Sequence, residues 1–302
     1  MTDSLAHTVQ ILREITQDIH QVPFICERRN GALSYAVDSQ TNQLDVSATA
    51  MALDHFPAPL SHLPRLRRLF LGENAFQNIP EEICQLSGLK ELYIYSNHLK
   101  TLPPALGALS QLKILDLSHQ PLENVPEELG NLSNLETLYL SDTNITQFPK
   151  ALSGLRSLRY LGLTDNKISE LPEALGELVQ LQELRLYNNK LTHLPASLGN
   201  LSALRELYLR GNPLEALPKT FGQLKQLEFV DLRGTCLTSL PASIGELGAL
   251  AYLDLRANPL TELPESLQNL KKLRKLDLRW TRIGKEPPWF QTLRDQGTLI
   301  YL

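Results

Sequence analysis

The sequence predicts an α/β solenoid, a curved coil of like units with a parallel sheet on its concave face and short helical turns and loops on its convex face. The main observation is a leucine repeated every 23 residues without an insertion. Two further regularities are the alternation of apolar and polar residues in the first half of each unit and the proline in its second half. A period kept this strictly is typical of stacked repeats, each of which contacts only its neighbours. The repeated leucines are Leu66, Leu89, Leu112, Leu135, Leu158, Leu181, Leu204, Leu227, Leu250 and Leu273.

The first half of each unit alternates apolar and polar residues with a period of two, as the segment from Leu181 to Leu186 illustrates. This alternation predicts a short strand whose leucines point inward and whose intervening side chains point outward. Where the chain turns out of the strand, the ninth position usually holds asparagine, whose amide can bond backbone groups that are left unpaired there. These residues are Asn74, Asn97, Asn166, Asn189, Asn212 and Asn258.

The second half of each unit contains a proline followed by apolar residues, as in Leu194-Pro195, Leu198-Gly199 and Leu201. Proline is tolerated at the first position of a helical turn because the N–H that it lacks would have no partner there. We therefore expect a short helical turn that begins at the proline and lies on the convex side of each unit.

The period also divides the chain, which we interpret as one continuous domain. Residues 1–42 are expected to form an N-terminal cap, with an amphipathic helix followed by a hairpin whose strands meet at Asn30-Gly31, a favoured turn dipeptide. Residues 43–65 form a degenerate first repeat, residues 66–295 the ten regular repeats, and residues 296–302 a capping strand. Caps are expected because a stack of repeats exposes apolar surface at both ends.

Charge and cysteine usage restrict the partners and the compartment. The formal net charge is -4 and the pI is about 6.0, which argues against nucleic acid and anionic membrane as partners. The cysteines Cys26, Cys84 and Cys236 are few and odd in number, which favours a reducing compartment, the cytoplasm. Residues 1–20 lack the apolar core of a signal peptide. The alternative localisation is therefore a host cell, reached by a signal-peptide-independent route.

The repeat motif resembles that of the leucine-rich repeat superfamily. The segment 181–201, LQELRLYNNKLTHLPASLGNL, is similar to the 23-residue cytosolic class found in Ras-signalling scaffolds, plant intracellular Ras-group proteins and bacterial effectors. The resemblance covers about four fifths of the chain and implies a horseshoe that binds partners, usually proteins, on its concave face. A fold does not define a function, so the partner must be inferred from the surface itself.

The outward-facing strand residues form three columns, at the third, fifth and seventh positions of the repeats, and seven of the nine tyrosines fall in them. Tyrosine, tryptophan and arginine are enriched at binding hot spots. The alternative is that strand propensity alone recruits tyrosine to a sheet. The predicted partner-binding residues are Phe70, Tyr93, Tyr95, Tyr139, Tyr160, Arg185, Tyr187, Tyr208, Arg210, Phe229, Arg233, Tyr252, Arg256, Arg279 and Trp280.

Four arginines of the seventh-position column form a ladder with rungs roughly 5 Å apart, a spacing that suits an acidic or phosphorylated segment. Three aspartates stand two residues earlier, and pairing with them would leave the arginines little charge for a ligand. Both interpretations stay open, as do an anchoring and a capping role for Trp280. The arginines are Arg210, Arg233, Arg256 and Arg279, and the aspartates are Asp231, Asp254 and Asp277.

The sequence predicts no enzyme, no cofactor and no metal site. The seven histidines are scattered, and no metal-ligand spacing, glycine-rich phosphate loop or Ser/His/Asp motif is present. The nearest candidate group across neighbouring repeats comprises Tyr95, His98, His119 and Asp142. We therefore predict a monomeric, non-enzymatic module that binds a protein or peptide. The alternatives are a secreted bacterial effector and the substrate-recognition part of a larger ubiquitin-ligase-like or signalling protein.

Overall fold

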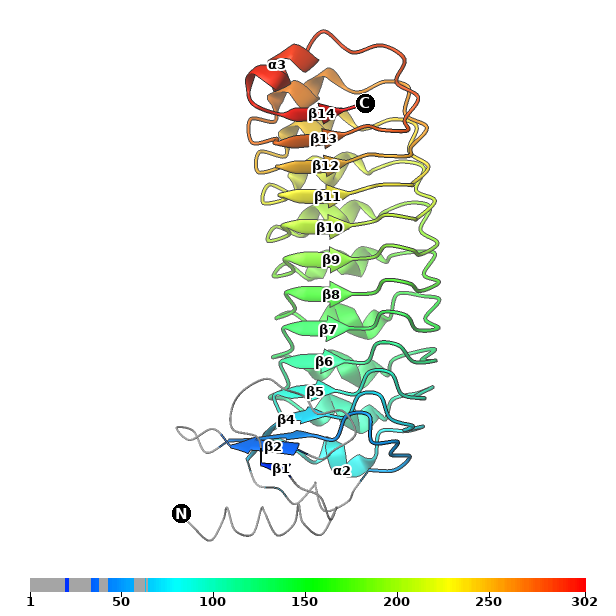
Figure 1. Cartoon of the computed structure of the whole chain (residues 1–302), viewed down its shortest axis with the longest axis vertical. Helices are drawn as coiled ribbons and strands as arrows, with labels where there is room; N and C mark the ends of the chain where they lie inside the picture. The colour runs from blue at the N-terminus through cyan, green and yellow to red at the C-terminus, as the bar shows by residue number, and fades with distance from the viewer. Residues whose placement is uncertain (1–19, 22–33, 38–42, 57–62, 64) are drawn as a thin grey trace. The chain divides into compact units, whose positions relative to one another are not determined.

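The computed structural model describes residues 20–21, 34–37, 43–56, 63 and 65–302. The chain divides into two compact units, Met1–Asn144 and Ile145–Leu302, and each is described by itself. The predicted N-terminal helix and the Asn30-Gly31 turn lie outside the described residues. In both units the strands of successive repeats lie side by side, as Figure 1 shows.

In the first unit, all neighbouring strands pair in parallel except β2 and β3, which are antiparallel. The strands are β1 (His20–Gln21), β2 (Ser34–Val37), β3 (Leu44–Ser47), β4 (Leu66–Phe70), β5 (Glu91–Tyr93), β6 (Ile114–Asp116) and β7 (Thr137–Tyr139). The helical segments that the structure describes in this unit are the short α-helix α2 (Glu81–Cys84) and the 3₁₀ helices η2 (Pro104–Ala108) and η3 (Glu127–Asn131).

In the second unit, the strands β8 to β14 form an entirely parallel sheet. They are β8 (Tyr160–Gly162), β9 (Glu183–Arg185), β10 (Glu206–Tyr208), β11 (Phe229–Asp231), β12 (Tyr252–Asp254), β13 (Lys275–Asp277) and β14 (Leu299–Tyr301). The helices are η4 (Lys150–Gly154), η5 (Glu173–Glu177), η6 (Ala196–Asn200), η7 (Lys219–Gln223), η8 (Ala242–Glu246), η9 (Glu265–Asn269) and α3 (Phe290–Asp295).

The repeated leucines form the core of each unit, which confirms the predicted solenoid. Within one repeat, Leu181, Leu184, Leu186 and Leu191 are fully buried, whereas Glu183 and Arg185 between them are partly exposed. Burial of leucine is the main favourable contribution to folding, and here it is distributed evenly along the repeats. The strand side chains between the leucines are therefore available to carry function.

The buried asparagines hold the turn that follows each strand, and their predicted structural role is confirmed. Asn212 donates through Nδ2 to the carbonyl oxygens of Leu186 and Leu209, both at 2.9 Å, and its Oδ1 accepts the N–H of Leu191 at 3.1 Å. One side chain thus satisfies backbone groups of its own repeat and of the preceding one. Without it, these polar groups would be buried without partners.

The helical turns begin one residue later than the sequence predicts. In η7 the proline, Pro218, precedes the first helical residue with φ -66° and ψ 150°, so its backbone is extended, and its carbonyl accepts the N–H of Phe221 at 2.9 Å. The glycine of this helix permits close stacking, since a Cβ on Gly222 would lie 2.2 Å from the carbonyl oxygen of Ser243 in the next repeat. Within the described part of the chain, no helix has the length and apolarity needed to span a membrane.

We predict that Asn212→Ala lowers the free energy of unfolding by about 1–3 kcal/mol, because buried backbone groups lose their hydrogen-bond partners. Urea denaturation of the variant and the wild type measures the difference. The matched control is Asn269→Ala, at the exposed end of η9, which should change stability by less than about 0.5 kcal/mol. Equal losses for the two variants would contradict the structural role of the buried amide.

Candidate partner-binding face

The exposed sheet face of each unit consists of the strand side chains that alternate with the buried leucines. Strand register aligns these side chains in columns, because Glu206 pairs with Phe229 and Tyr208 with Asp231. The same register relates Phe229 to Tyr252 on the next strand. Neighbours in a column are about 4.7–4.9 Å apart along the sheet, so their side chains can contact one another directly.

In the first unit, the aromatic side chains of this face are packed and hydrogen-bonded. The rings of Phe70 and Tyr93 stack with centroids 4.7 Å apart and an interplanar angle of 6°. The Tyr93 hydroxyl donates to Glu91 at 3.1 Å, and burial together with that carboxylate raises the pKa of Tyr93. Tyr95 lies over Gly72, where a Cβ would be 2.5 Å from its ring. The glycine therefore makes room for the tyrosine.

In the second unit, four aromatic residues and one arginine form a continuous strip across β8 to β12, which we call the aromatic strip. The guanidinium of Arg185 lies 5.6 Å from the ring centroid of Tyr160 and 4.9 Å from that of Tyr208. Tyr208 contacts Phe229 at 5.0 Å between centroids, and Phe229 contacts Tyr252 at 6.1 Å. The strip thus places five large side chains of five successive strands in mutual contact.

Two glutamates fix the orientation of this strip. Glu183 accepts a hydrogen bond from Nε of Arg185 at 2.5 Å, and Glu206 accepts one from the Tyr208 hydroxyl at 2.6 Å. Burial and the carboxylate of Glu206 raise the pKa of Tyr208, so its phenol keeps its proton at neutral pH. Side chains held in this way lose little conformational entropy when a partner binds.

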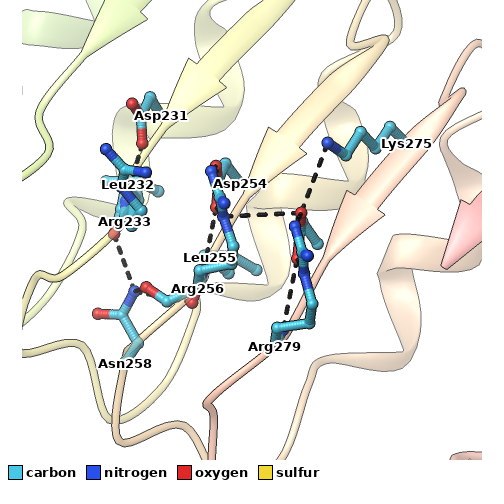
Figure 2. A network of polar contacts seen from close by, with 10 residues as sticks. Asp231, Leu232, Arg233, Asp254, Leu255, Arg256, Asn258, Lys275 and Arg279 are labelled. Atoms are coloured by element: carbon cyan, nitrogen blue, oxygen red, sulfur yellow. Dashed lines mark hydrogen bonds and ion pairs between the residues drawn. The ribbon is translucent and has the colours of Figure 1, made fainter. Parts of the chain in front are cut away.

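The arginine ladder divides into two parts, and its C-terminal part is ion-paired. Nε of Arg256 bonds both carboxylate oxygens of Asp254, at 2.9 and 3.0 Å. Nε and Nη2 of Arg279 bond Asp277 at 2.9 and 2.7 Å, and Lys275 approaches the same carboxylate at 3.5 Å. Figure 2 shows these contacts. These two arginines are therefore largely neutralised by their own chain.

The side chain of Asp277 is fully buried. Burial alone would raise its pKa, but the hydrogen bonds and charge of Arg279, together with the charge of Arg256, outweigh burial and lower the pKa. Asp231 lacks such bidentate partners, and burial raises its pKa although the charges of Arg233 and Arg210 act in the opposite direction. Asp231 and Asp277 of this column therefore lie in different electrostatic environments.

The N-terminal part of the ladder has no ion pair among the described residues. Arg233 bonds Asp231 through its backbone N–H, at 3.0 Å, while its guanidinium makes no such contact. The guanidinium of Arg210 lies 4.9 Å from the ring centroid of Tyr187. Stacking on an aromatic face orients a guanidinium and leaves its N–H groups free to meet an incoming oxyanion.

Trp280 lies on the exposed side of the turn that follows β13. It is 71% exposed, whereas Trp289 and Phe290 pack edge to face at 4.9 Å and Phe290 is buried. The guanidinium of Arg279 lies 5.7 Å from the Trp280 ring and 5.4 Å from that of Tyr301. Trp280 is therefore separate from the aromatic cluster that fills the C-terminal end of the core.

Sequence reasoning placed Lys275 in the third-position column but did not identify Tyr301 or Leu299 as parts of this face. Asp277 pairs with Tyr301, which is 24 residues further along the chain rather than 23, because the last unit is one residue longer. A column read with a constant period therefore misses β14. Columns extended by the pairing of β13 with β14, rather than by the 23-residue period, include Leu299 and Tyr301.

The candidate enzymatic group does not assemble into a buried site. Nδ1 of His119 lies 3.0 Å from Asp142, and both side chains are exposed, while the exposed Tyr95 hydroxyl donates to Glu73 at 3.3 Å. Among the described residues, no group of three or more His, Cys, Asp or Glu side chains is arranged to hold a metal ion. Burial raises the pKa of Cys84 to about 11, which opposes formation of a nucleophilic thiolate.

We predict that Asp277→Asn lowers the free energy of unfolding by about 1–3 kcal/mol near pH 7. Because the pKa of Asp277 is lowered on folding, its stabilisation is present above the ordinary value of 3.8 and is lost as pH falls through the folded pKa. The difference between variant and wild type should therefore shrink below about pH 4. Urea denaturation near pH 7 and near pH 3 measures it.

The matched control is Asp231→Asn, for which the electrostatic contribution to the free energy of unfolding near pH 7 has the opposite sign. Because the pKa of Asp231 is raised, folding disfavours its charged form, and this cost is absent once the pH falls below 3.8. The variant should be at least as stable as the wild type near pH 7. A loss as large as that of Asp277→Asn would contradict the different environments assigned to the two carboxylates.

Comparison with known proteins agrees with this geometry. Models described as "Leucine-rich repeat region" match residues 150–229 and 196–281, and models described as "Leucine rich repeat" match residues 64–122, 110–168 and 272–293. No curated protein sequence matches the chain.

Several solved structures are similar to the chain. A leucine-rich repeat protein of Leptospira interrogans is 36% identical, with a TM-score of 0.78, over 83% of this chain and 64% of that one. The Arabidopsis receptor kinase HAESA, solved with the peptide hormone IDA and the co-receptor SERK1, is 29% identical, with a TM-score of 0.68, over 82% and 43%. The plant peptide hormone receptor RGFR1, in complex with RGF2, is 25% identical, with a TM-score of 0.61, over 75% and 42%.

This chain thus spans less than two thirds of the length of each of these three proteins. The repeat motif, the stacked parallel strands and these matches lead to one conclusion. The chain belongs to the leucine-rich repeat superfamily.

Proposed function

We propose that this protein is a non-enzymatic protein-interaction module that binds an extended acidic segment of a partner protein on the exposed sheet face of its second unit. The observation that carries the proposal is the aromatic strip from Tyr160 to Tyr252, which lies beside two arginines, Arg210 and Arg233, that have no carboxylate partner among the described residues. An acidic segment supplies carboxylates that can pair with these two arginines.

The aromatic strip suits a binding surface because its side chains are large, amphipathic and already ordered. Tyrosine and arginine dominate binding hot spots, since each supplies much contact area together with hydrogen-bonding groups. The carboxylates of Glu183 and Glu206 hold Arg185 and Tyr208 in place before any partner arrives. Preorganisation of this kind reduces the entropic cost of binding.

The uneven pairing of the arginine ladder defines the charge of the expected partner. Arg256 and Arg279 are neutralised by Asp254 and Asp277, so they offer little attraction to an anion. Arg210 and Arg233 stand on the turns after two adjacent strands, about 5 Å apart along the sheet. Two guanidinium groups at this spacing favour carboxylates or a phosphorylated side chain on a bound segment.

The comparisons support a binding role of this kind. Leucine-rich repeat chains form protein-interaction modules. Two of the similar structures are a peptide hormone receptor in complex with RGF2 and a receptor kinase in complex with the peptide hormone IDA. We propose that this chain likewise takes a peptide-like segment, without a cofactor and as a monomer. We propose a cytoplasmic compartment, which the few and odd-numbered cysteines favour.

A second candidate function is that of a bacterial effector, or of the recognition part of a larger ubiquitin-ligase-like or signalling protein. The observation in its favour is the similarity, at 36% identity, to a leucine-rich repeat protein of Leptospira interrogans, a bacterium. Both candidate functions use the same exposed sheet face, so substitutions of its tyrosines and arginines test either one.

We predict that the double substitution Tyr187→Ala and Tyr208→Ala lowers recovery of the natural partner by at least about tenfold, because it removes two aromatic contacts from the face. Affinity capture with the tagged chain from its own cells, quantified by mass spectrometry, measures recovery. The control is the double substitution Lys219→Ala and Glu265→Ala, two exposed residues of η7 and η9, which should leave recovery unchanged. Unchanged recovery with the tyrosine variant would refute the proposed face.

We also predict that Arg233→Glu weakens the captured complex by about tenfold or more, because the reversed charge repels an acidic segment. Arg233→Gln should have a smaller effect, and the difference between the two variants should diminish at high salt, since exposed charges are screened. Binding isotherms at two ionic strengths measure both effects. A complex that tightens with Arg233→Glu would show that the partner is basic.

A further inference from the structure

We propose that Trp280, together with Arg279, Leu299 and Tyr301, forms a second docking site, the Trp280 patch, for a partner segment in which an apolar side chain is flanked by carboxylates. This inference goes beyond the proposed function, because it holds whether or not the aromatic strip binds a partner. Arg279 and Trp280 lie in the turn that follows β13, and Leu299 and Tyr301 lie on the adjacent strand β14.

The backbone at Trp280 is unusual for so large a residue. Its φ is +63°, in the left-handed region that bulky L-residues rarely adopt. Every regular repeat has a positive φ at the equivalent position, but the other repeats hold small or polar residues there, which tolerate it better. These are Glu73, Ser96, His119, Asp142, Asp165, Asn188, Gly211, Gly234 and Ala257. Folding therefore gives no reason for tryptophan at this position.

Packing gives no reason for it either. The side chain of Trp280 is 71% exposed, so it contributes little buried area to the fold. The end of the core is filled instead by Phe290, which is buried and packs against Trp289. A strained and exposed tryptophan is destabilising to the isolated chain, and such residues concentrate at binding sites.

The neighbours of Trp280 extend it into an apolar surface, against which the guanidinium of Arg279, paired with Asp277, packs. Leu299 is 60% exposed and Tyr301 is 40% exposed, and both follow the columns of the exposed sheet face onto β14. The guanidinium of Arg279 lies over both rings, 5.7 Å from the centroid of Trp280 and 5.4 Å from that of Tyr301. Asp277 holds this guanidinium through two hydrogen bonds.

Charge indicates which partner fits the patch. Residues 271–302 contain eight Lys and Arg but only three Asp and Glu, a net charge of +5, whereas the whole chain carries -4. The remaining 270 residues therefore carry -9. A basic end on an acidic chain attracts acidic segments, and the exposed rings at its surface offer contact for an apolar side chain.

The same charges argue against a second copy of this chain as the partner. Two Trp280 patches meeting about a two-fold axis would bring their basic surroundings together and repel each other. Docking of the patch on an acidic surface elsewhere on another copy would be a head-to-tail contact, which generates rings or open filaments rather than closed dimers. A segment of a different protein brings neither the repulsion between like charges nor the head-to-tail assembly of a second copy. It is therefore the occupant that we propose.

The test is selection of peptides from a displayed library of random dodecamers on the immobilised full chain, with the Trp280→Gly chain in excess as competitor. We expect enrichment of peptides that contain an aromatic or aliphatic residue flanked by Asp or Glu. Each should bind Trp280→Gly at least about tenfold more weakly than the wild type. The matched control is Val179→Ala, another exposed apolar position, which should leave affinity unchanged.

Thermal stability separates a binding role from a structural one. Because glycine adopts a positive φ without strain, Trp280→Gly should melt at or above the temperature of the wild type while losing the peptide. In a Trp289→Phe background, Trp280 is the sole tryptophan, so its emission should shift to shorter wavelength when a selected peptide covers it.

Several outcomes would overturn the proposal. They are a failure of any peptide to distinguish the wild type from Trp280→Gly, a preference for basic peptides, and a marked fall in the melting temperature of Trp280→Gly. A dimer in light scattering that Trp280→Gly dissolves would identify a second copy as the occupant. A tryptophan shift produced by phosphatidylserine and phosphatidylcholine vesicles, or by a single-stranded oligonucleotide, would assign the patch to a membrane or a nucleic acid instead.

Discussion

The structure depends on the hydrogen bonds that buried asparagines make at the end of each strand. A chain that turns out of a strand inside an apolar core leaves backbone groups unpaired, and burial of such groups is costly. Asn189 resolves this by donating to the carbonyl groups of Leu163 and Leu186 while accepting the N–H of Ile168. Each amide therefore bonds its own repeat and the one before it, so the turns stay in register with the leucines.

Where asparagine is absent, a neighbouring repeat supplies part of the bonding. Thr235 occupies the asparagine position, and the one proton of its hydroxyl has two acceptors within reach, the carbonyl of Leu232 at 3.1 Å and Oδ1 of Asn258 in the following repeat at 2.5 Å. Because these amides and hydroxyls bond the turns from inside the core, most outward strand positions are not needed to hold the turns. That freedom permits aromatic and charged side chains to be placed on one face without loss of the fold.

The charged residues of that face differ in ways that their spacing hides. Arg233 and Arg279 occupy equivalent positions two repeats apart, yet Arg279 holds Asp277 through two side-chain hydrogen bonds while Arg233 contacts Asp231 only through its backbone. An internally paired guanidinium stabilises the protein, whereas an unpaired one is available to a ligand. Equal spacing in the sequence therefore does not reveal that one part of the arginine ladder is neutralised by its own chain while the other part can attract an acidic ligand.

The sequence by itself determined the repeat, the inward leucines, the structural role of the asparagines and the columns of the exposed face, because each of these depends on local periodicity. Only the tertiary structure decided which side chains meet across strands. Arg185 lies between Tyr160 and Tyr208, Tyr301 joins the face although its repeat is one residue longer, and Trp280 stays exposed while Phe290 fills the core. These contacts follow from side-chain rotamers and inter-strand register, which a single period does not specify.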